Sequence, residues 1–324
     1  MSTLDYRKGF HDLGQGCHAW LQPDGSWGWS NSGLITGSGT SLMVDTLFDL
    51  ALTREMLDGF GPVVADHPLQ TLVNTHSDPD HTFGNELLAA RGVEIVASEA
   101  AAELMTQEAA DAVTGTKRMP GALGDFARHI FGPFDLEGIT ATGPDRTFTG
   151  EESVDVGGRE VRLIQVGPAH TPGDALVYVP DARLLYAGDI LFVGGTPIAW
   201  AGPIERWVAA LDLILDMDVT AVVPGHGPVS GKAEVAAMRE YLVFVETEAR
   251  KRYEDGLGVD DAITTIDLGK FADLPESGRL AQNVLNVYQQ LDSSVARPDR
   301  LNVLTKIAAL EGFPNAALRA EPRE

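Results

Sequence analysis

The 324-residue chain contains very little cysteine and no long apolar run. A single cysteine, Cys17, cannot form a disulfide within the chain, and such low usage is typical of proteins in a reducing compartment. The N-terminal sequence lacks the apolar core of a signal peptide, and no later window approaches about 18 consecutive apolar residues. We therefore expect a cytoplasmic protein that has no membrane partner.

Positive charge is also scarce. The chain has 24 Lys and Arg residues against 47 Asp and Glu residues, which gives a net charge of −23. This balance would repel nucleic acid, and no basic stripe offsets it. Hydrophobic residues make up 44% of the chain, which is enough for a sizeable core. We expect a globular protein with a small-molecule substrate, and the sequence leaves open whether it forms an oligomer.

The order of short apolar runs predicts two similar series of strands. The first has expected strands at 16–22, 30–37, 41–46, 71–74 and 93–97, with helices at 50–60, 84–91 and 98–110. The second has expected strands at 146–156, 160–166, 175–180, 183–188 and 219–224, with a helix at 204–216. Two such series indicate two sheets packed face to face with helices outside, an α/β sandwich.

Two segments stand apart from these series. Residues 113–136 contain glycine and proline hinges between apolar residues, and we interpret them as a flap over the functional edge of the sandwich. From residue 231 the pattern becomes helical, with helices expected at 231–254, 278–292 and 298–310. We therefore expect an αββα domain at 1–230 and, at 231–324, a helical C-terminal extension packed on the same domain.

The turn NTHSDPDHTFGN at 74–85 concentrates potential metal ligands directly after a buried strand. It contains His76, Asp78, Asp80 and His81 within six positions. Three other strands also stop at a single residue of this kind; these residues are His170, Asp189 and His226. Because loop residues just past buried strands are rigidly aimed, their convergence predicts a metal site at one edge of the sandwich. The isolated histidines His11, His18, His67 and His129 are expected to have no such role.

The pattern of these residues resembles the metallo-β-lactamase superfamily. Its signature is His-x-His-x-Asp-His, followed by a lone histidine, a lone aspartate and a final histidine, and the resemblance extends over roughly residues 15–230. It implies a four-layer αββα sandwich with two divalent metal ions, usually zinc. One metal would bind His76, the residue at 78 and His170, the other would bind Asp80, His81 and His226, and Asp189 would bridge them. Asp45 also matches a family position that supports the ligands, although a turn or cap aspartate is an equal alternative.

Position 78 departs from the family pattern, which has histidine where this chain has Asp78. The resemblance therefore implies a variant subgroup that has aspartate in place of the second histidine of the motif. A carboxylate ligates zinc at nearly the imidazole distance, about 2.0–2.2 Å, but as a harder anion it favours Mn²⁺ or Fe²⁺ more. Two outcomes are open: Asp78 coordinates and the site is dinuclear, or Asp78 points away and only the second site binds firmly.

By this resemblance the chain is a metal-dependent hydrolase. A metal-bound hydroxide would cleave an ester, a thioester or a related carbonyl bond, and Asp80 would be the catalytic residue that orients the hydroxide or receives its proton. The absence of a Gly-x-Ser-x-Gly motif agrees with a reaction that needs no nucleophilic side chain. Two alternatives remain: a polyketide cyclase or thioesterase that uses the same metals, and a non-catalytic metal- or ligand-binding protein.

Aromatic residues suggest the nature of the substrate. Residues 22–33 carry Trp27 and Trp29, and residues 190–207 carry Phe192 and Trp200 directly after Asp189. Aromatic loops beside a metal predict a wall for a hydrophobic or aromatic small molecule, and the alternative is ordinary core packing.

Overall fold

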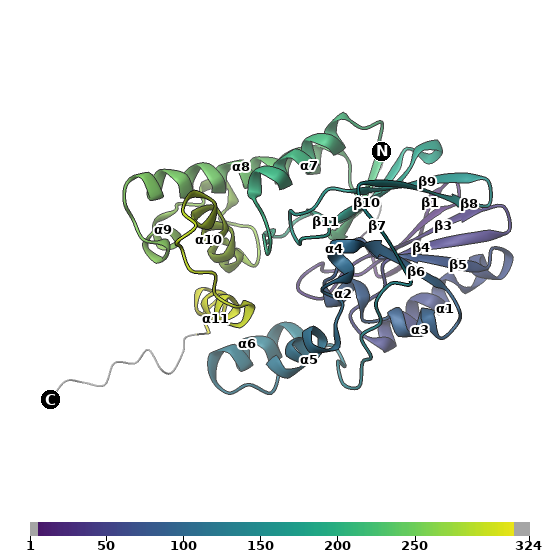
Figure 1. The fold of residues 1–324 in the computed structure, drawn as a ribbon, viewed down its shortest axis with the longest axis horizontal. Helices are drawn as coiled ribbons and strands as arrows, with labels where there is room; N and C mark the ends of the chain where they lie inside the picture. Colours follow the sequence, from purple (N-terminus) through teal and green to yellow (C-terminus); the bar gives the residue numbers. More distant parts are fainter. Residues whose placement is uncertain (1–5, 314–324) are drawn as a thin grey trace.

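Two β-sheets face each other in the computed structural model, which describes residues 6–313 (Figure 1). The first sheet has seven strands in sequence order: β1 (Gly9–Gly14), β2 (Cys17–Leu21), β3 (Ser32–Gly37), β4 (Thr40–Val44), β5 (Leu69–Val73), β6 (Glu94–Ser98) and β7 (Arg146–Phe148). The second has the order β12 (Ala221–His226), β11 (Leu184–Phe192), β10 (Ala175–Val179), β9 (Arg159–Gln165) and β8 (Glu151–Val156). Strands β4 to β7 are parallel, and so are β11 and β12.

Alternating side chains along the strands fill the space between the sheets. In β2, Ala19 and Leu21 belong to the core cluster that joins both sheets, whereas Trp20 belongs to the cluster on the outer face. Leu163 of β9 and Val177 of β10 contribute to the same inner cluster from the second sheet. Because successive side chains of a strand point to opposite faces, each sheet has two apolar faces to bury.

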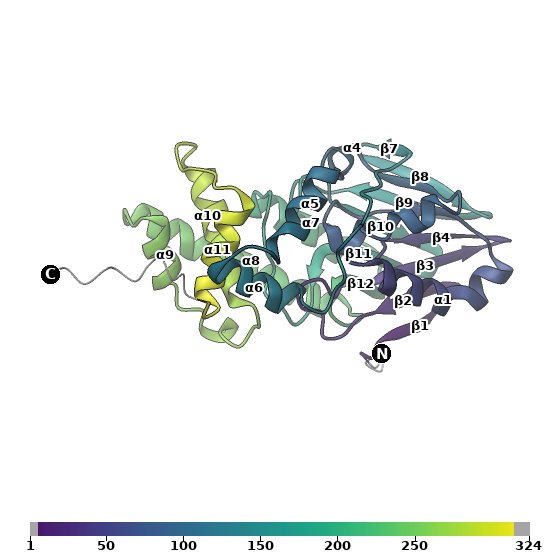
Figure 2. The ribbon, with the colours of Figure 1, turned by 90° about the horizontal axis from the view of Figure 1, so that it is seen from below.

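Helices cover both outer faces. Helices α1 (Leu50–Asp66) and α3 (Asn85–Ala89) pack on the first sheet, where Phe60 is fully buried. Helices α7 (Ile204–Asp216) and α8 (Lys232–Glu254) pack on the second, where Trp207 is fully buried. Figure 2 shows these layers from below. The expected four-layer αββα sandwich is confirmed.

The helices after residue 231 form a group at one end of the sandwich (Figure 1). Besides α8 they are α9 (Val259–Thr265), α10 (Leu280–Leu291) and α11 (Arg300–Leu310), with short 3₁₀ turns η2 (Gly269–Phe271) and η3 (Ser277–Arg279). Helix α10 packs on α8, and α11 packs against both α10 and α6 (Gly121–Phe131). Within residues 6–313, no helix is both long enough and apolar enough to cross a bilayer.

The structure differs from the sequence expectation at several places. Residues 146–148, expected in the second series of strands, form β7 at the edge of the first sheet. Strand β1 was not expected, because GFHDLG has few apolar residues; it pairs with β2 at the sheet edge, with Phe10 opposite Trp20. The helix expected at 98–110 is two helices, α4 (Glu99–Ala102) and α5 (Gln107–Thr116). The side chain of Thr106 accepts a hydrogen bond from the backbone N–H of Ala109 and so caps a new helix.

Candidate metal centre

Ends of strands from both sheets bring the candidate ligands together. His76 follows β5, Asp80 and His81 lie on the short helix α2 (Pro79–Thr82), and His170 lies in the loop between β9 and β10. Asp189 and His226 lie within β11 and β12, which are neighbouring parallel strands. Both strands are longer at their carboxyl ends than the sequence pattern predicted.

All four histidines direct the same ring nitrogen into the cluster. Their Nδ1 atoms are each engaged outside it: His76 with Thr75 Oγ1 at 3.0 Å, His81 with Asp45 Oδ2 at 2.9 Å, His170 with the Ile198 carbonyl at 2.7 Å and His226 with the Gly25 carbonyl at 3.1 Å. Such outer partners fix the ring orientation and leave Nε2 free to bind. The four Nε2 atoms all lie within 4 Å of a carboxylate of the cluster.

The carboxylate of Asp189 lies between two groups of ligands. Its Oδ1 atom is 3.1 Å from His81 Nε2 and 3.5 Å from His226 Nε2. Its Oδ2 atom is 3.3 Å from His170 Nε2 and 3.8 Å from His76 Nε2. Each oxygen therefore faces a different half of the cluster, which is the arrangement that a bridging carboxylate requires.

The cluster divides into two half-sites that share Asp189. We call the group of His76, Asp78 and His170 the first half-site, and the group of Asp80, His81 and His226 the second half-site. Within each group, one ligand atom from every residue lies within 4.8 Å of the others, and His76, His81 and Asp189 form a third such group between them. Asp78 therefore lies with the ligands, and its Oδ2 atom is 3.2 Å from His170 Nε2.

The chemistry of these donors fits divalent metal ions. Imidazole nitrogens and carboxylate oxygens are the ligands that zinc accepts, and Mn²⁺ and Fe²⁺ accept the same mixed set. Among the described residues, the buried atoms His76 Nε2, His81 Nε2 and Asp189 Oδ1 have no hydrogen-bond partner. Because leaving buried polar atoms unpaired is costly, these atoms indicate a ligand that the side chains themselves do not supply.

The pKa values reflect the strong coupling of buried charges. Burial alone would raise the pKa of Asp189, but His226, His81 and His76 hold it well below its usual value. Burial would lower the pKa of His226, but Asp189 and Asp80 raise it to about 9. Burial and the neighbouring His81 lower the pKa of His76 to about 4. Imidazoles that hold protons in this cluster would have to release them to bind a metal.

Asp45 lies at the end of β4 and contacts the turn at residues 74–85, which we call the ligand turn because it carries four of the candidate ligands. Its Oδ1 atom accepts a hydrogen bond from the Thr75 backbone N–H at 2.7 Å, and its Oδ2 atom accepts one from the Thr75 hydroxyl at 2.7 Å. The same Oδ2 is the partner of His81 Nδ1. Asp45 has a φ of +60°, a conformation that an aspartate tolerates better than most residues. The carboxylate thus connects the turn to the orientation of one ligand.

The four aromatic residues expected at the substrate lie at different depths. Phe192 is buried and stacks on His226, with ring centroids 5.2 Å apart and an interplanar angle of 2°. Trp200 and Trp27 are partly buried. Trp29 packs on Phe134, at 4.7 Å between ring centroids, and is not in contact with a histidine of the cluster. Phe192 is therefore the one of the four that contacts the ligands directly.

The segment 113–136 lies on the same side of the sandwich as His226. It consists of the end of α5, helix α6 and the turn that follows. Phe126 and Phe131 of this segment lie against Trp27, with ring centroids 6.4 and 6.5 Å apart. The loop of Trp27 reaches His226 through the Gly25 carbonyl. This position is the one that a flap requires, and its movement stays a prediction.

Two arginines near the centre were not expected from the sequence. Arg300, at the start of α11, lies 3.3 Å from Asp78 Oδ1 and 4.7 Å from the ring centroid of Trp200. Arg279, which is 2% exposed, lies 4.0 Å from the ring centroid of Trp27. Both residues come from the C-terminal helices, and no sequence signal connects them to the ligand turn.

The isolated histidines lie outside the cluster, as expected. His11 Nε2 contacts the Arg7 carbonyl at 2.8 Å, and His67 Nδ1 contacts the Gly37 carbonyl at 2.8 Å. His18 packs near Phe10, and His129 packs near Phe313. None of them belongs to a group of potential metal ligands within residues 6–313.

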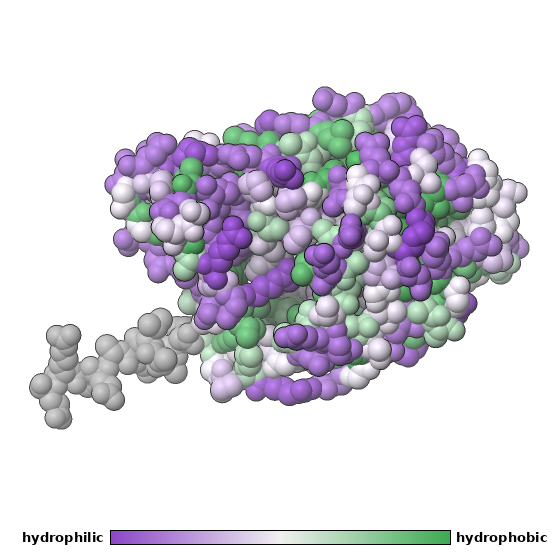
Figure 3. Space-filling view, in the orientation of Figure 1, coloured by the Kyte–Doolittle hydropathy of each residue, from purple (hydrophilic) through white to green (hydrophobic). Residues whose placement is uncertain are grey.

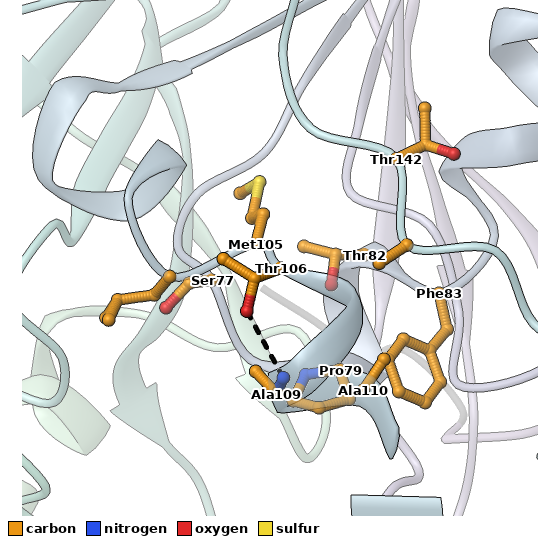
Figure 4. A pocket seen from close by; sticks show the side chains of 11 residues that line it. Ser77, Pro79, Thr82, Phe83, Met105, Thr106, Ala109, Ala110 and Thr142 are labelled. Carbon is orange, nitrogen blue, oxygen red and sulfur yellow. Dashed lines mark hydrogen bonds between the residues drawn. The ribbon is translucent and has the colours of Figure 1, made fainter. Parts of the chain in front are cut away.

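A small open pocket, with a volume of about 20 Å³, lies beside the ligand turn (Figure 4). Ser77, Pro79 and Phe83 line it from the turn, Met105 lines it from the loop between α4 and α5, and Ala109 lines it from α5. None of the candidate ligands lines it, so this pocket is separate from the metal centre. Figure 3 shows the hydrophilic face of the molecule, with apolar atoms gathered in a hollow above α5 and α6.

Comparison with known families agrees with this geometry. The family model described as the metallo-beta-lactamase superfamily matches residues 25–226, which include the whole candidate metal centre.

Individual relatives are more distant. The chain is 26% identical over 198 residues to a 2,4-dinitroanisole O-demethylase subunit alpha of Nocardioides sp., covering 59% of this chain and 51% of that protein. It is 26% identical over 255 residues to a linear primary-alkylsulfatase of Pseudomonas sp., and this match covers 70% of this chain and 48% of that protein. The structure of the sec-alkylsulfatase Pisa1 from Pseudomonas sp. superimposes on this chain with a TM-score of 0.65 at 18% identity. The superposition covers 87% of this chain and 50% of the sulfatase. The chain thus spans about half the length of these proteins.

Proposed function

The chain belongs to the metallo-beta-lactamase superfamily, and on that basis we propose that it is a metal-dependent hydrolase that cleaves an ester or thioester of a hydrophobic or aromatic small molecule. The observation that carries this proposal is the convergence of four histidine Nε2 atoms on the two oxygens of Asp189. This arrangement supports two metal positions on either side of one carboxylate.

Seven residues would hold the metals. His76, Asp78 and His170 would bind one ion, Asp80, His81 and His226 would bind the other, and Asp189 would bind both. Divalent ions in such a site lower the pKa of water towards about 7 and polarise the bond to be cleaved. Zinc fits the imidazole-rich donor set, and Mn²⁺ or Fe²⁺ would also be accepted.

We assign proton transfer to Asp80. Its side chain is 15% exposed, compared with 4% for Asp189, so it is more accessible than the carboxylate between the two half-sites. Its Oδ2 atom lies 3.2 Å from His226 Nε2, and the Ser30 hydroxyl donates to its backbone carbonyl. Burial would raise the pKa of Asp80, but in the metal-free protein His81 and then His226 hold it below its usual value. The ionised carboxylate is the form that can accept a proton from attacking water.

Aromatic side chains lie beside the candidate ligands. Phe192 covers one face of His226, and Trp27 and Trp200 lie farther out, each beneath an arginine. Such walls favour substrates with an apolar or aromatic part, because removing that part from water stabilises the complex by about 25 cal/mol per Å².

A second candidate is hydrolysis of an alkyl sulfate. It is favoured by the match to a linear primary-alkylsulfatase over 70% of this chain and by the structural likeness to a sec-alkylsulfatase. The same metal centre would serve both reactions, because each requires an activated water beside a polarised ester oxygen.

The test compares matched substrates on protein purified without chelator. A p-nitrophenyl carboxylic ester, an acyl thioester and an alkyl sulfate, each with the same chain length, would be assayed before and after removal of metal with EDTA. We expect turnover of at least one substrate, its loss with EDTA and its recovery on adding Zn²⁺, Mn²⁺ or Fe²⁺.

His226→Ala is the diagnostic variant, and His67→Ala, outside the cluster, is the control. The proposal requires His226→Ala to lose activity and His67→Ala to keep it. Metal-loaded protein without activity on any of these substrates, or equal activity in both variants, would refute the hydrolase assignment.

A further inference from the structure

Arg300 and Asp78 form an ion pair at the first half-site. Both terminal nitrogens of Arg300 lie 3.3 Å from Asp78 Oδ1, while the other oxygen, Oδ2, faces His170 Nε2 at 3.2 Å. One oxygen of the carboxylate is therefore turned outward to the arginine and the other inward to the ligands. The arginine side chain is itself held over Trp200, at 4.7 Å from the ring centroid.

The side chain of Asp78 has an alternative orientation, in which it would cap helix α2 and not face the cluster. It is the N-cap residue of α2, with a φ of −68° and a ψ of 145°, and aspartate is among the residues most favoured at that position. An N-cap aspartate normally accepts a hydrogen bond from a backbone N–H of the first turn. The Asp78 side chain makes no such bond. The ion pair with Arg300 and the contact with His170 thus occupy the carboxylate in place of a cap.

Charge gives a second reason for the pair. Where the superfamily pattern has a neutral histidine, this chain has an aspartate, which adds one negative charge to a cluster that already contains Asp80 and Asp189. Arg300 supplies one positive charge directly beside it. The pair is therefore neutral as a unit, as a histidine is, and it retains an oxygen directed at the half-site.

We propose that Arg300 is a positioning residue that holds Asp78 in the ligand orientation, so that helix α11 completes the first half-site. The proposal rests on the proposed metal-dependent function, and it assigns a role to a segment outside residues 25–226, the part that the family model matches. Helix α11 is fixed in the fold by its buried residues Val303 and Ile307 and by its packing on α6 and α10.

The test measures metal affinity rather than turnover. Zinc affinity of each half-site would be determined by chelator competition for the wild type, Arg300→Gln and Arg300→Lys. Because loss of a residue that orients a ligand typically weakens metal binding by about 10- to 100-fold, we expect Arg300→Gln to weaken the first half-site by at least about tenfold. The second half-site should remain unchanged, and Arg300→Lys, which keeps the charge, should lose less.

Two controls separate this role from a general effect on the helix. Lys306→Gln removes another ion pair of α11, formed with Asp260, which belongs to no group of candidate ligands. We expect wild-type affinity at both half-sites. In an Asp78→His background the carboxylate is absent, so adding Arg300→Gln should cause no further loss. Thermal unfolding of each metal-free variant would show whether the fold is retained.

Several results would overturn the proposal. Unchanged affinity in Arg300→Gln would do so, including the case in which only the KM for an anionic substrate rises, because Arg300 would then bind substrate. An equal loss in Lys306→Gln, or an equal loss in the Asp78→His background, would assign the effect to helix packing. A wild type that binds no metal would refute the proposed function as well, whereas a wild type with two metals and an insensitive Arg300→Gln would refute this inference alone.

Discussion

The carboxylate of Asp45 contacts His81 Nδ1 at 2.9 Å, on the side of the ring opposite the metal centre. Because Asp45 also binds the backbone N–H and the hydroxyl of Thr75, it connects the ligand turn to one ligand.

We predict that Asp45→Asn weakens metal binding at the second half-site by roughly 10- to 100-fold, because an amide is a poorer acceptor for His81 Nδ1–H than a carboxylate. Asparagine tolerates the positive φ of this position, so the fold should be retained. Chelator competition measures the affinity, and circular dichroism checks the fold. An affinity equal to wild type would make Asp45 a turn residue only.

Asp78→Ala should lose the metal of the first half-site selectively. His76 and His170 would remain, together with one oxygen of Asp189, which leaves the coordination sphere under-filled. Elemental analysis after gel filtration should show about one metal fewer per chain than in the wild type, with the second half-site retained. If wild type and variant hold equal amounts of metal, Asp78 is not a ligand.

Metal binding should release protons and strengthen as the pH rises. In the metal-free protein His226 has a pKa of about 9, raised by Asp189 and Asp80, so below that pH it carries a proton that a metal must displace. The pKa values of His81 and His170 are raised as well. Apparent zinc affinity should therefore increase about tenfold per pH unit for each proton released, until the imidazoles have lost their protons. An indicator dye in weakly buffered solution counts the protons. A constant affinity from about pH 6 to 9 would contradict this prediction.

The flap hypothesis predicts faster hydrogen exchange in α6 than in the buried strand β11. Helix α6 lies between Gly121 and Gly132, and Phe126 and Phe131 pack its inner face on Trp27. Opening would separate these contacts and the packing of α6 on α11, whereas opening β11 requires global unfolding. Exchange monitored by mass spectrometry, with and without a slowly cleaved substrate analogue, tests this. Equal protection of α6 and β11 would make the segment a fixed wall.

The convergence of the candidate ligands was predictable from the sequence because each follows or ends an apolar strand, and ends of parallel strands meet at one edge. His170, Asp189 and His226 are each flanked by small residues that mark such an end. The sandwich followed from the same runs. Strand β1 was missed because an edge strand with one exposed face needs few apolar residues.

Arg300 could not be predicted in this way. Its contact with Asp78 joins residues 222 positions apart and depends on how α11 packs against α6 and α10. Periodicity predicts that a helix forms at 298–310, but it does not predict which ligand the first residue of that helix meets. The separation of α4 from α5 did have a local signal, because Thr106 is a favoured N-cap residue and caps α5. A search for apolar periodicity alone does not detect such a cap.

The ion pair between α11 and the ligand turn has a consequence for the order of assembly during synthesis. The ribosome makes all seven candidate ligands before it makes Arg300. The second half-site can therefore form on a nascent chain, whereas the first waits until α11 has emerged and docked. The two metal positions would then mature one after the other, and a chain arrested before residue 300 would bind metal at full affinity only in the second half-site, that of Asp80, His81 and His226.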